Sequence, residues 1–83
     1  MTVTVADTQV VTEYEFTIII ERDEDGAFIS SCPALPGCHS AGETEEEARE
    51  MIKDAIALYL SYLREKGEPI PADVTVVKVR VSA

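Results

Sequence analysis

The stretch FTIIIERDEDGAFISSC, residues 16–32, decides the fold. From Tyr14 onward, apolar and polar side chains alternate, and this period of two is typical of a β-strand with one buried face. Asp25-Gly26 then lies between two apolar-rich segments, which predicts a tight turn because glycine tolerates the positive φ angle that such turns require. The sequence therefore predicts a β-hairpin whose returning strand covers about 27–32.

Two further strands are predicted outside this hairpin. A Pro/Gly-rich loop leads to a third short strand at about 38–41. Three strands are the smallest sheet expected to be stable in water with support from a helix. The sequence closes with DVTVVKVRVSA, residues 73–83, in which valines alternate with Lys78 and Arg80. Because valine favours strands, this segment predicts a final strand.

Between these segments, GETEEEAREMIKDAIALYLSYLREKG predicts a helix of about twenty residues. Thr44, with Glu47 three residues later, forms a capping box, and the glutamates of the first turn suit the positive end of the helix dipole. Gly67 is placed as the C-terminal cap, and the prolines that follow at 69 and 71 prevent continuation. The apolar positions recur at helical spacing: Ala48, Met51, Ile52, Ala55, Ile56, Tyr59, Tyr62 and Leu63.

The predicted order is β-β-β-α-β, an α+β domain with one helix on one face of a mainly antiparallel sheet. A chain of 83 residues has room for a single domain, which we assign to residues 13–83. Residues 1–12 are expected to be an N-terminal arm or an extra edge strand. Leu58, Leu60 and the valine-rich final segment exceed the apolar surface that such a sheet covers. We therefore expect a homo-oligomer, a dimer in the first place and a tetramer as the alternative.

The charge limits the choice of partner. The chain carries 7 basic and 16 acidic residues, a net charge of −9, and is therefore repelled by phosphate backbones and attracted to basic partners. No apolar run approaches the roughly 20 residues of a membrane span, and no leader segment opens the chain. Two cysteines do not make a secreted disulfide scaffold. We expect a cytoplasmic protein with no membrane association and no direct nucleic-acid contact.

The segment CPALPGCHS, residues 32–40, brings two cysteines and a histidine together around a Pro/Gly-rich loop. A structural zinc site usually has four ligands that start from a C-x₂₋₄-C pair, whereas the spacing here is C-x₅-C and the chain has no other Cys or His. A redox pair would resemble C-x-x-C at a helix start, and a cysteine nucleophile would need an oxyanion hole and an orienting group. We interpret the loop as structural, with cysteines that act as small apolar residues. No metal, cofactor or catalytic residue is predicted.

The acidic turn is the second candidate site. Glu21, Asp23 and Asp25 alternate, so their carboxylates could converge on Mg²⁺ or Ca²⁺. The fragment D-x-D-G resembles the opening of a calcium loop, but the downstream glutamate is missing at the required distance. Because Asp favours turns and water, a solvated turn is the preferred interpretation.

A longer pattern runs from Phe16 to Pro71. It reads F-x-I-x-I-E-x-D-E-D-G-x-F-x-x-x-C-P-A-L-P-G-C-x-S-x-G-x-T-x-E-E-A, followed by I-x-x-A-I-x-x-Y-L and G-E-P-I-P. This combination resembles the HicB family of antitoxins. The resemblance implies a partial RNase H-like fold with the β-β-β-α-β order, and it implies the role of binding and neutralising HicA, a small basic toxin that cleaves mRNA. It also implies that the catalytic carboxylates of RNase H are not in a working arrangement.

Charge indicates where such a toxin would bind. The expected contacts lie at the hairpin tip and at the corner before the helix: Asp23, Glu24, Asp25, Glu43, Glu45 and Glu46. Other residues of the pattern are expected to shape the domain: Gly26, Cys32, Pro33, Leu35, Pro36, Gly37, Cys38, Thr44, Gly67 and Pro69.

Two alternatives to the antitoxin hypothesis remain at this stage. The first is an interaction or structural module that forms a homo-oligomer without a toxin partner. The second is a metal-dependent nuclease on the RNase H-like core, against which the charge of −9 argues. Many HicB antitoxins also carry a C-terminal ribbon-helix-helix or helix-turn-helix segment that binds DNA. This sequence ends at Ala83 without such a pattern, so operator binding is not expected.

Overall fold

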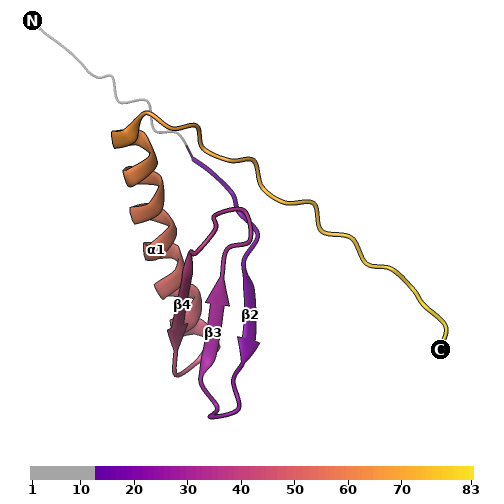
Figure 1. The fold of residues 1–83 in the computed structure, drawn as a ribbon. Coiled ribbons are helices and arrows are strands. Elements are labelled where there is room, and N and C mark those ends of the chain that lie inside the picture. Colours follow the sequence, from indigo (N-terminus) through magenta and orange to yellow (C-terminus); the bar gives the residue numbers. More distant parts are fainter. Residues whose placement is uncertain (1–12) are drawn as a thin grey trace, which may run out of the picture.

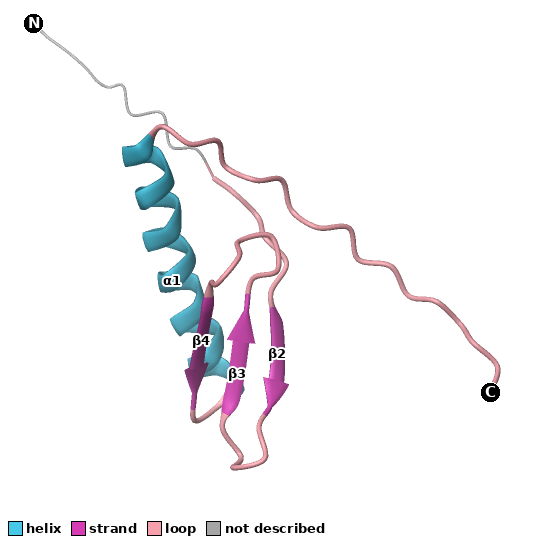
Figure 2. Cartoon of the chain, viewed as in Figure 1, coloured by secondary structure: helices cyan, strands magenta, loops and turns pink. Residues whose placement is uncertain are grey.

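A three-stranded sheet and one long helix make up the body of the molecule (Figure 1, Figure 2). The computed structural model describes residues 13–83, so the arm predicted for residues 1–12 lies outside the described residues. In chain order the elements are β2 (Ile19–Arg22), β3 (Phe28–Ser31), β4 (His39–Gly42) and α1 (Glu45–Lys66). Within this range, the α+β class, the antiparallel sheet and the single helix predicted from the sequence are confirmed.

The strands lie side by side in the order in which they occur along the chain, and both pairs are antiparallel. The hairpin turn between β2 and β3 forms where the Asp-Gly pair predicts it. Its closing hydrogen bond runs from the N–H of Asp23 to the carbonyl of Ala27, at 2.7 Å. Gly26 has a φ of 89°, a conformation that side-chain-bearing residues rarely adopt, so glycine is required at this point of the turn.

The helix covers one face of the sheet. Ser30 is fully buried on this face, and its Oγ donates a hydrogen bond of 3.0 Å to the carbonyl of Ala48 in α1. Ile20 lies directly opposite Ser30 and therefore shares the covered face. On the other face, Ile19 and Ile29 remain 45% and 36% exposed. The sheet thus has a covered face and an open, partly apolar face.

The closest approach between sheet and helix is made at the end of β4. A Cβ atom on Gly42 would lie 2.5 Å from the backbone nitrogen of Ala48 and 2.9 Å from the carbonyl carbon of Glu47. Ala48 itself is completely buried. The first turn of α1 can therefore lie against β4 only because position 42 has no side chain, and the small Ala48 completes the contact.

The core is small and is built around the loop of residues 32–38, here called the Cys-loop. Its buried cluster consists of Cys32, Leu35, Cys38 and Ile52, and partly buried side chains pack around it: Phe16, Ile18, Ala34, Ala55, Ile56, Tyr59 and Leu60. Two apolar helix positions predicted from periodicity, Met51 and Tyr62, remain 46% and 55% exposed. The reason is that a sheet of three short strands covers only a narrow stripe of the helix.

Both ends of α1 are capped. The Oγ1 of Thr44 accepts from the N–H of Glu47 at 3.0 Å, as the capping box predicts. The reciprocal bond differs from the predicted one, because the carboxylate of Glu47 accepts from the N–H of Glu43 at 2.6 Å. Gly67 ends the helix in the left-handed conformation with φ 71°, and its N–H donates to the carbonyl of Arg64 at 3.1 Å.

The final strand predicted for residues 73–83 does not form. Its root is fixed, because the N–H and Oγ1 of Thr17 donate to the two carboxylate oxygens of Asp73 at 2.9 and 2.8 Å. Beyond this point the chain is extended, leaves the body and pairs with no strand in the described part of the chain (Figure 1). A strand exists only where a neighbouring backbone supplies hydrogen bonds, and a valine pattern does not specify that neighbour. The predicted β-β-β-α-β order is therefore corrected to β-β-β-α followed by an extended arm, residues 74–83.

The contact at Gly42 predicts the effect of adding one methyl group there. Gly42→Ala should lower the free energy of unfolding by about 1–3 kcal/mol, because the new Cβ forces β4 and α1 apart. Ala41→Val on the open face of the same strand is the control and should change stability by about 0.5 kcal/mol or less. Urea unfolding followed by circular dichroism measures both, and equal effects would contradict the proposed contact.

The burial of α1 predicts a contrast between two adjacent residues. Ile52 is 1% exposed and Met51 is 46% exposed. Ile52→Ala should cost roughly 2–5 kcal/mol, because it leaves a cavity in the core, whereas Met51→Ala should cost less than about 1 kcal/mol. Thermal and urea unfolding of both variants test this. A larger loss of stability for Met51→Ala than for Ile52→Ala would mean that another face of α1 packs against the sheet.

Candidate protein-interaction surface

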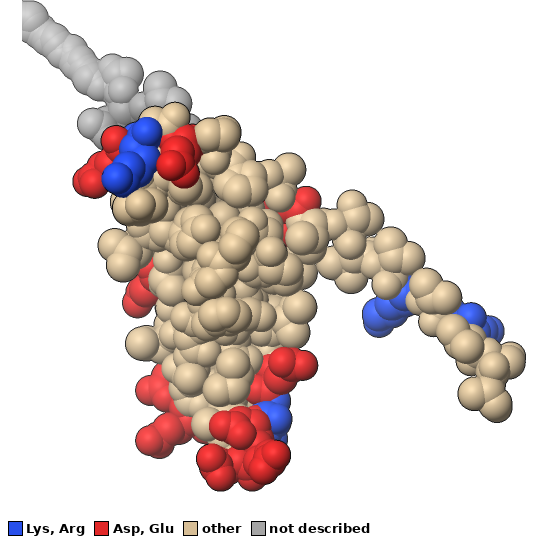
Figure 3. Space-filling view, viewed as in Figure 1, with Lys and Arg blue, Asp and Glu red and all other residues tan. Residues whose placement is uncertain are grey.

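The β2–β3 turn and the corner between β4 and α1 lie at the same end of the molecule (Figure 1). This follows from the topology, since β2 and β4 both run antiparallel to β3 and therefore finish on the same side. We call residues 21–25 and 43–50 the acidic end, and Figure 3 shows acidic atoms gathered there. It contains nine acidic residues and two basic ones: Glu21, Asp23, Glu24, Asp25, Glu43, Glu45, Glu46, Glu47 and Glu50 against Arg22 and Arg49. The fold thus brings together all six partner contacts suggested by charge.

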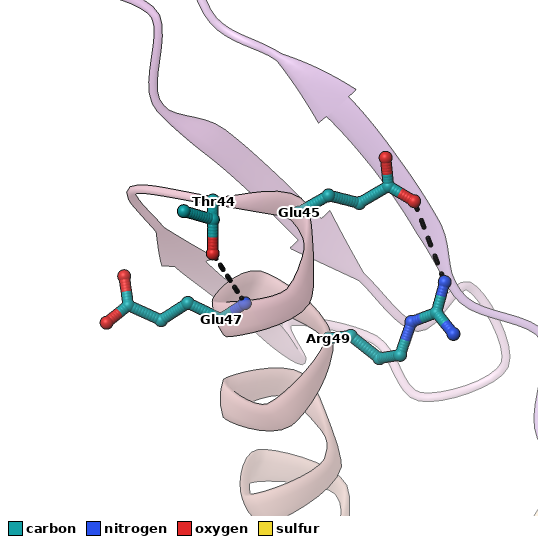
Figure 4. Close-up of polar contacts among 4 residues, drawn as sticks. All are labelled: Thr44, Glu45, Glu47 and Arg49. Atoms are coloured by element: carbon teal, nitrogen blue, oxygen red, sulfur yellow. Dashed lines mark hydrogen bonds and ion pairs between the residues drawn. The ribbon is translucent and has the colours of Figure 1, made fainter.

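The two arginines neutralise little of this surface. The Arg22 guanidinium lies over the Phe28 ring, 5.4 Å from its centroid. Arg49 Nη2 is 3.6 Å from Glu45 Oε2, with both side chains more than 60% exposed (Figure 4). An exposed ion pair one helical turn apart contributes only about 0.3–0.5 kcal/mol and is screened by salt. The acidic end therefore keeps a strong negative potential.

Some of these carboxylates also serve the fold. One oxygen of Asp23 accepts from the N–H of Asp25 at 3.3 Å, which supports the turn. The carboxylate of Glu47 is held by the N–H of Glu43 at the start of α1. Glu47 was not among the predicted contacts, and its role in the helix cap is a structural one.

Residues 13–83 contain neither a metal-binding cluster nor a membrane-spanning helix. No group of three or more His, Cys, Asp or Glu side chains is placed there to hold a metal ion. The same part of the chain contains no helix with the length and apolar character needed to cross a bilayer.

The Cys-loop is a sequence of backbone turns. The N–H of Cys32 donates to the carbonyl of Cys38 at 3.1 Å, and the N–H of Leu35 donates to the carbonyl of Cys32 at 3.0 Å. Gly37, at φ 80°, supplies the left-handed residue that returns the chain to β4. Both cysteines are free thiols packed in the core, whereas His39 is exposed on β4. The thiols are therefore held in the core, whereas the histidine that follows Cys38 is exposed.

Burial sets the chemistry of the two thiols. Desolvation raises the pKa of Cys32, and it raises the pKa of Cys38 with a smaller contribution from the neighbouring Cys32. A thiol with a raised pKa has little of the thiolate that acts as nucleophile or metal ligand. These thiols are therefore poorly suited to catalysis.

Two grooves lie along α1 beyond its first turns, and sequence reasoning located neither. The first, of about 340 Å³, is lined by Gly37, Cys38, His39, Ala55, Leu58, Tyr59 and Tyr62. The second, also of about 340 Å³, lies between α1 and the segment before β2 and is lined by Tyr14, Phe16, Lys53, Ile56, Ala57, Leu60, Ser61 and Arg64. Leu58 and Leu60 widen the apolar stripe of the helix, and this was the one sign of the grooves in the sequence. Helical periodicity does not show which part of such a stripe the sheet leaves uncovered.

Comparison with known proteins places this architecture in a family. Residues 16–82 match the family model described as HicB_like antitoxin of bacterial toxin-antitoxin system. The chain belongs to this family. The match runs from the segment before β2 to the extended arm, so the HicB-like pattern read from the sequence is confirmed.

Individual relatives support the same assignment. A UPF0150 protein of Synechocystis sp. is 42% identical over 65 residues, which is 78% of this chain and 82% of that protein. A UPF0150 protein of Archaeoglobus fulgidus is 44% identical over 66 residues, or 77% of this chain and 96% of that protein. Antitoxin HicB 1 of Photorhabdus laumondii is 31% identical over 62 residues, 75% of this chain and 40% of that antitoxin.

A solved structure shares the arrangement of elements. The crystal structure of the N-terminal domain of Burkholderia pseudomallei antitoxin HicB matches with a TM-score of 0.58 and 29% sequence identity. The match covers 80% of this chain and 69% of that one. The sheet and helix described above are thus those of a HicB-type domain.

Thiol burial in this HicB-like chain predicts slow reaction of the native thiols and a pH-dependent free energy of unfolding. Cys32 and Cys38 should react with a disulfide reagent far more slowly in the native protein than in urea, because burial raises both thiol pKa values. The folded thiols also keep their protons at a pH where the unfolded ones lose them, so the free energy of unfolding should fall as pH rises above the ordinary thiol pKa of about 8.5. Stopped-flow thiol titration and urea melts between neutral and alkaline pH measure both effects. Native thiols that react as fast as unfolded ones would contradict this assignment.

Proposed function

We propose that this chain is an antitoxin that binds and neutralises a small basic toxin of the HicA type, an mRNA-cleaving protein. Membership of the HicB-like family supports the antitoxin class. The observation that carries the choice of partner is the acidic end, where nine acidic and two basic residues from two separate segments meet. A basic protein is the complement of such a surface. The mRNA target places this interaction in the cytoplasm.

Inhibition in this proposal is stoichiometric and requires no chemistry. A toxin that binds RNA must present basic side chains to phosphates, and an acidic protein surface competes for the same side chains. Complementary charge also steers the encounter and can raise association rates by roughly 10–10³. The chain acts by covering the RNA-binding face of the toxin, and we infer that it is not an enzyme.

The proposal includes a partial RNase H-like fold. Its support is the run of three antiparallel strands followed by a helix on one face. The acidic residues of this fold are used for recognition and for turns, as the hydrogen bond from Asp25 to Asp23 illustrates. The alternative is a homo-oligomeric module with no toxin, which the exposed valines of the extended arm favour.

Co-expression separates these two functions. A small basic protein encoded beside this chain should arrest growth when expressed alone, and growth should recover when this chain is expressed with it. The two proteins should purify together, and the pure chain should cleave no RNA. Persistent growth arrest together with failure to co-purify would reject the antitoxin role and leave the module without a toxin partner.

The role of the acidic end predicts a kinetic effect. The triple variant Asp23→Asn, Glu24→Gln and Asp25→Asn should associate more slowly with the toxin and show a weaker salt dependence, because exposed charges act mainly on the encounter. Such charges are screened beyond about 8 Å at physiological ionic strength. Surface plasmon resonance at several salt concentrations measures the association rate.

A matched control removes the same net charge elsewhere. Asp54→Asn, Glu65→Gln and Glu68→Gln neutralise three acidic residues from the middle of α1 to just beyond its C-terminus, outside the acidic end. This control should change the association rate much less than the hairpin variant. Equal effects of the two triple variants would mean that net charge, and not the acidic end, determines the encounter.

A further inference from the structure

Within residues 13–83, the extended arm has no partner strand. Four of its five valines are largely exposed, with exposed fractions of 66% for Val76, 71% for Val77, 77% for Val79 and 76% for Val81, whereas Val74 is 38% exposed. The arm departs from the body after Asp73, whose carboxylate accepts two hydrogen bonds from Thr17; this pair is called the Thr17–Asp73 clamp (Figure 1). A stretch of alternating β-branched residues with its backbone unpaired is a ready partner for a sheet edge.

The body offers such an edge at β2. The sheet order places β2 at one side, paired with β3 alone, so the other side of its backbone is free within residues 13–83. The second groove borders the segment that leads into β2, with Phe16, Ile56 and Leu60 in its lining. An added strand would send alternate side chains toward this groove and the others toward the open face of the sheet. The groove and the edge thus form one receptor for a valine-rich strand.

Length and charge fit the arm to this receptor. Residues 74–81 span roughly 26 Å when extended, enough to run along the full length of β2. All 16 acidic residues lie at or before Asp73, together with 5 basic ones, so residues 1–73 carry −11. The arm carries only Lys78 and Arg80, hence +2. The arm is therefore attracted to the body of any copy of this chain.

We propose that the arm of one copy adds as a strand to the β2 edge of a second copy, in a reciprocal exchange that forms a two-fold dimer. Each copy contributes one arm and one β2 edge, so two copies pair both arms and both β2 edges and close the assembly, while the β4 edges stay outside the exchange. The Thr17–Asp73 clamp fixes where each arm departs, and the proline-containing segment 67–72 before it limits the directions that the arm can take. This inference does not rest on the toxin-binding function.

The test combines mass with backbone protection. Light scattering of the full chain should give twice the protomer mass of 9.1 kDa. Hydrogen–deuterium exchange should show slow amides both in residues 74–81 and along β2. The double variant Val77→Asp and Val79→Asp should return the mass to that of a monomer and remove the protection of the arm. A monomer whose arm is protected would mean that the arm folds onto its own β2, and a monomer without protection would mean that it pairs with nothing; either result overturns the proposal.

The control is a residue of similar exposure on a different surface. Leu58 in α1 is 74% exposed, close to the 71% of Val77, so Leu58→Asp is matched with the single variant Val77→Asp: each adds one negative charge at an exposed position. The dimer should survive Leu58→Asp. A dimer that dissociates with Leu58→Asp and persists with the arm variant would place the interface on the helix and overturn the exchange.

Discussion

The close contact between the end of β4 and the first turn of α1 determines how the helix lies on the sheet. Gly42 lacks the side chain that would collide with the Ala48 nitrogen, and Ser30 fixes the same turn by a buried hydrogen bond to the Ala48 carbonyl. A buried hydroxyl that lost this partner would cost about 1–3 kcal/mol, so the contact also selects one position of the helix. With this turn held against β4, the rest of α1 crosses the sheet and covers the Cys-loop.

The same constraint explains what the sequence could and could not predict. The Asp25-Gly26 turn and the Thr44 cap are local signals, and each appears in the structure where the sequence placed it. The strand that the period of two predicts from Tyr14 onward forms only over Ile19–Arg22. The position of the helix over the sheet is not local, so Met51 and Tyr62 were assigned to the wrong environment. Gly42 was visible in the sequence, but only the packed structure shows that its role is a close approach between two elements.

The candidate surface shows the same division. The acidic residues of the hairpin tip and of the helix start could each be read from the sequence as solvated turns and caps. These two groups form one surface because the strand directions bring residues 21–25 and 43–50 to the same end of the molecule. The prediction of a final strand was wrong because it used local preference alone. Local preference gave it an extended backbone, but its hydrogen-bonding partner is not specified by any local signal.

The two proposed kinds of recognition use largely different parts of the architecture. Attraction between the acidic end and a basic partner acts at long range, is weakened by salt and needs little precise fit. Strand addition at β2 acts at contact, through backbone hydrogen bonds and valine burial, and is insensitive to salt in comparison. The β2 edge runs along the side of the sheet, whereas most of the acidic end lies where the strands terminate, and only Glu21 and Arg22 belong to both. A dimer built by arm exchange would therefore present two acidic ends and could hold two basic partners at once.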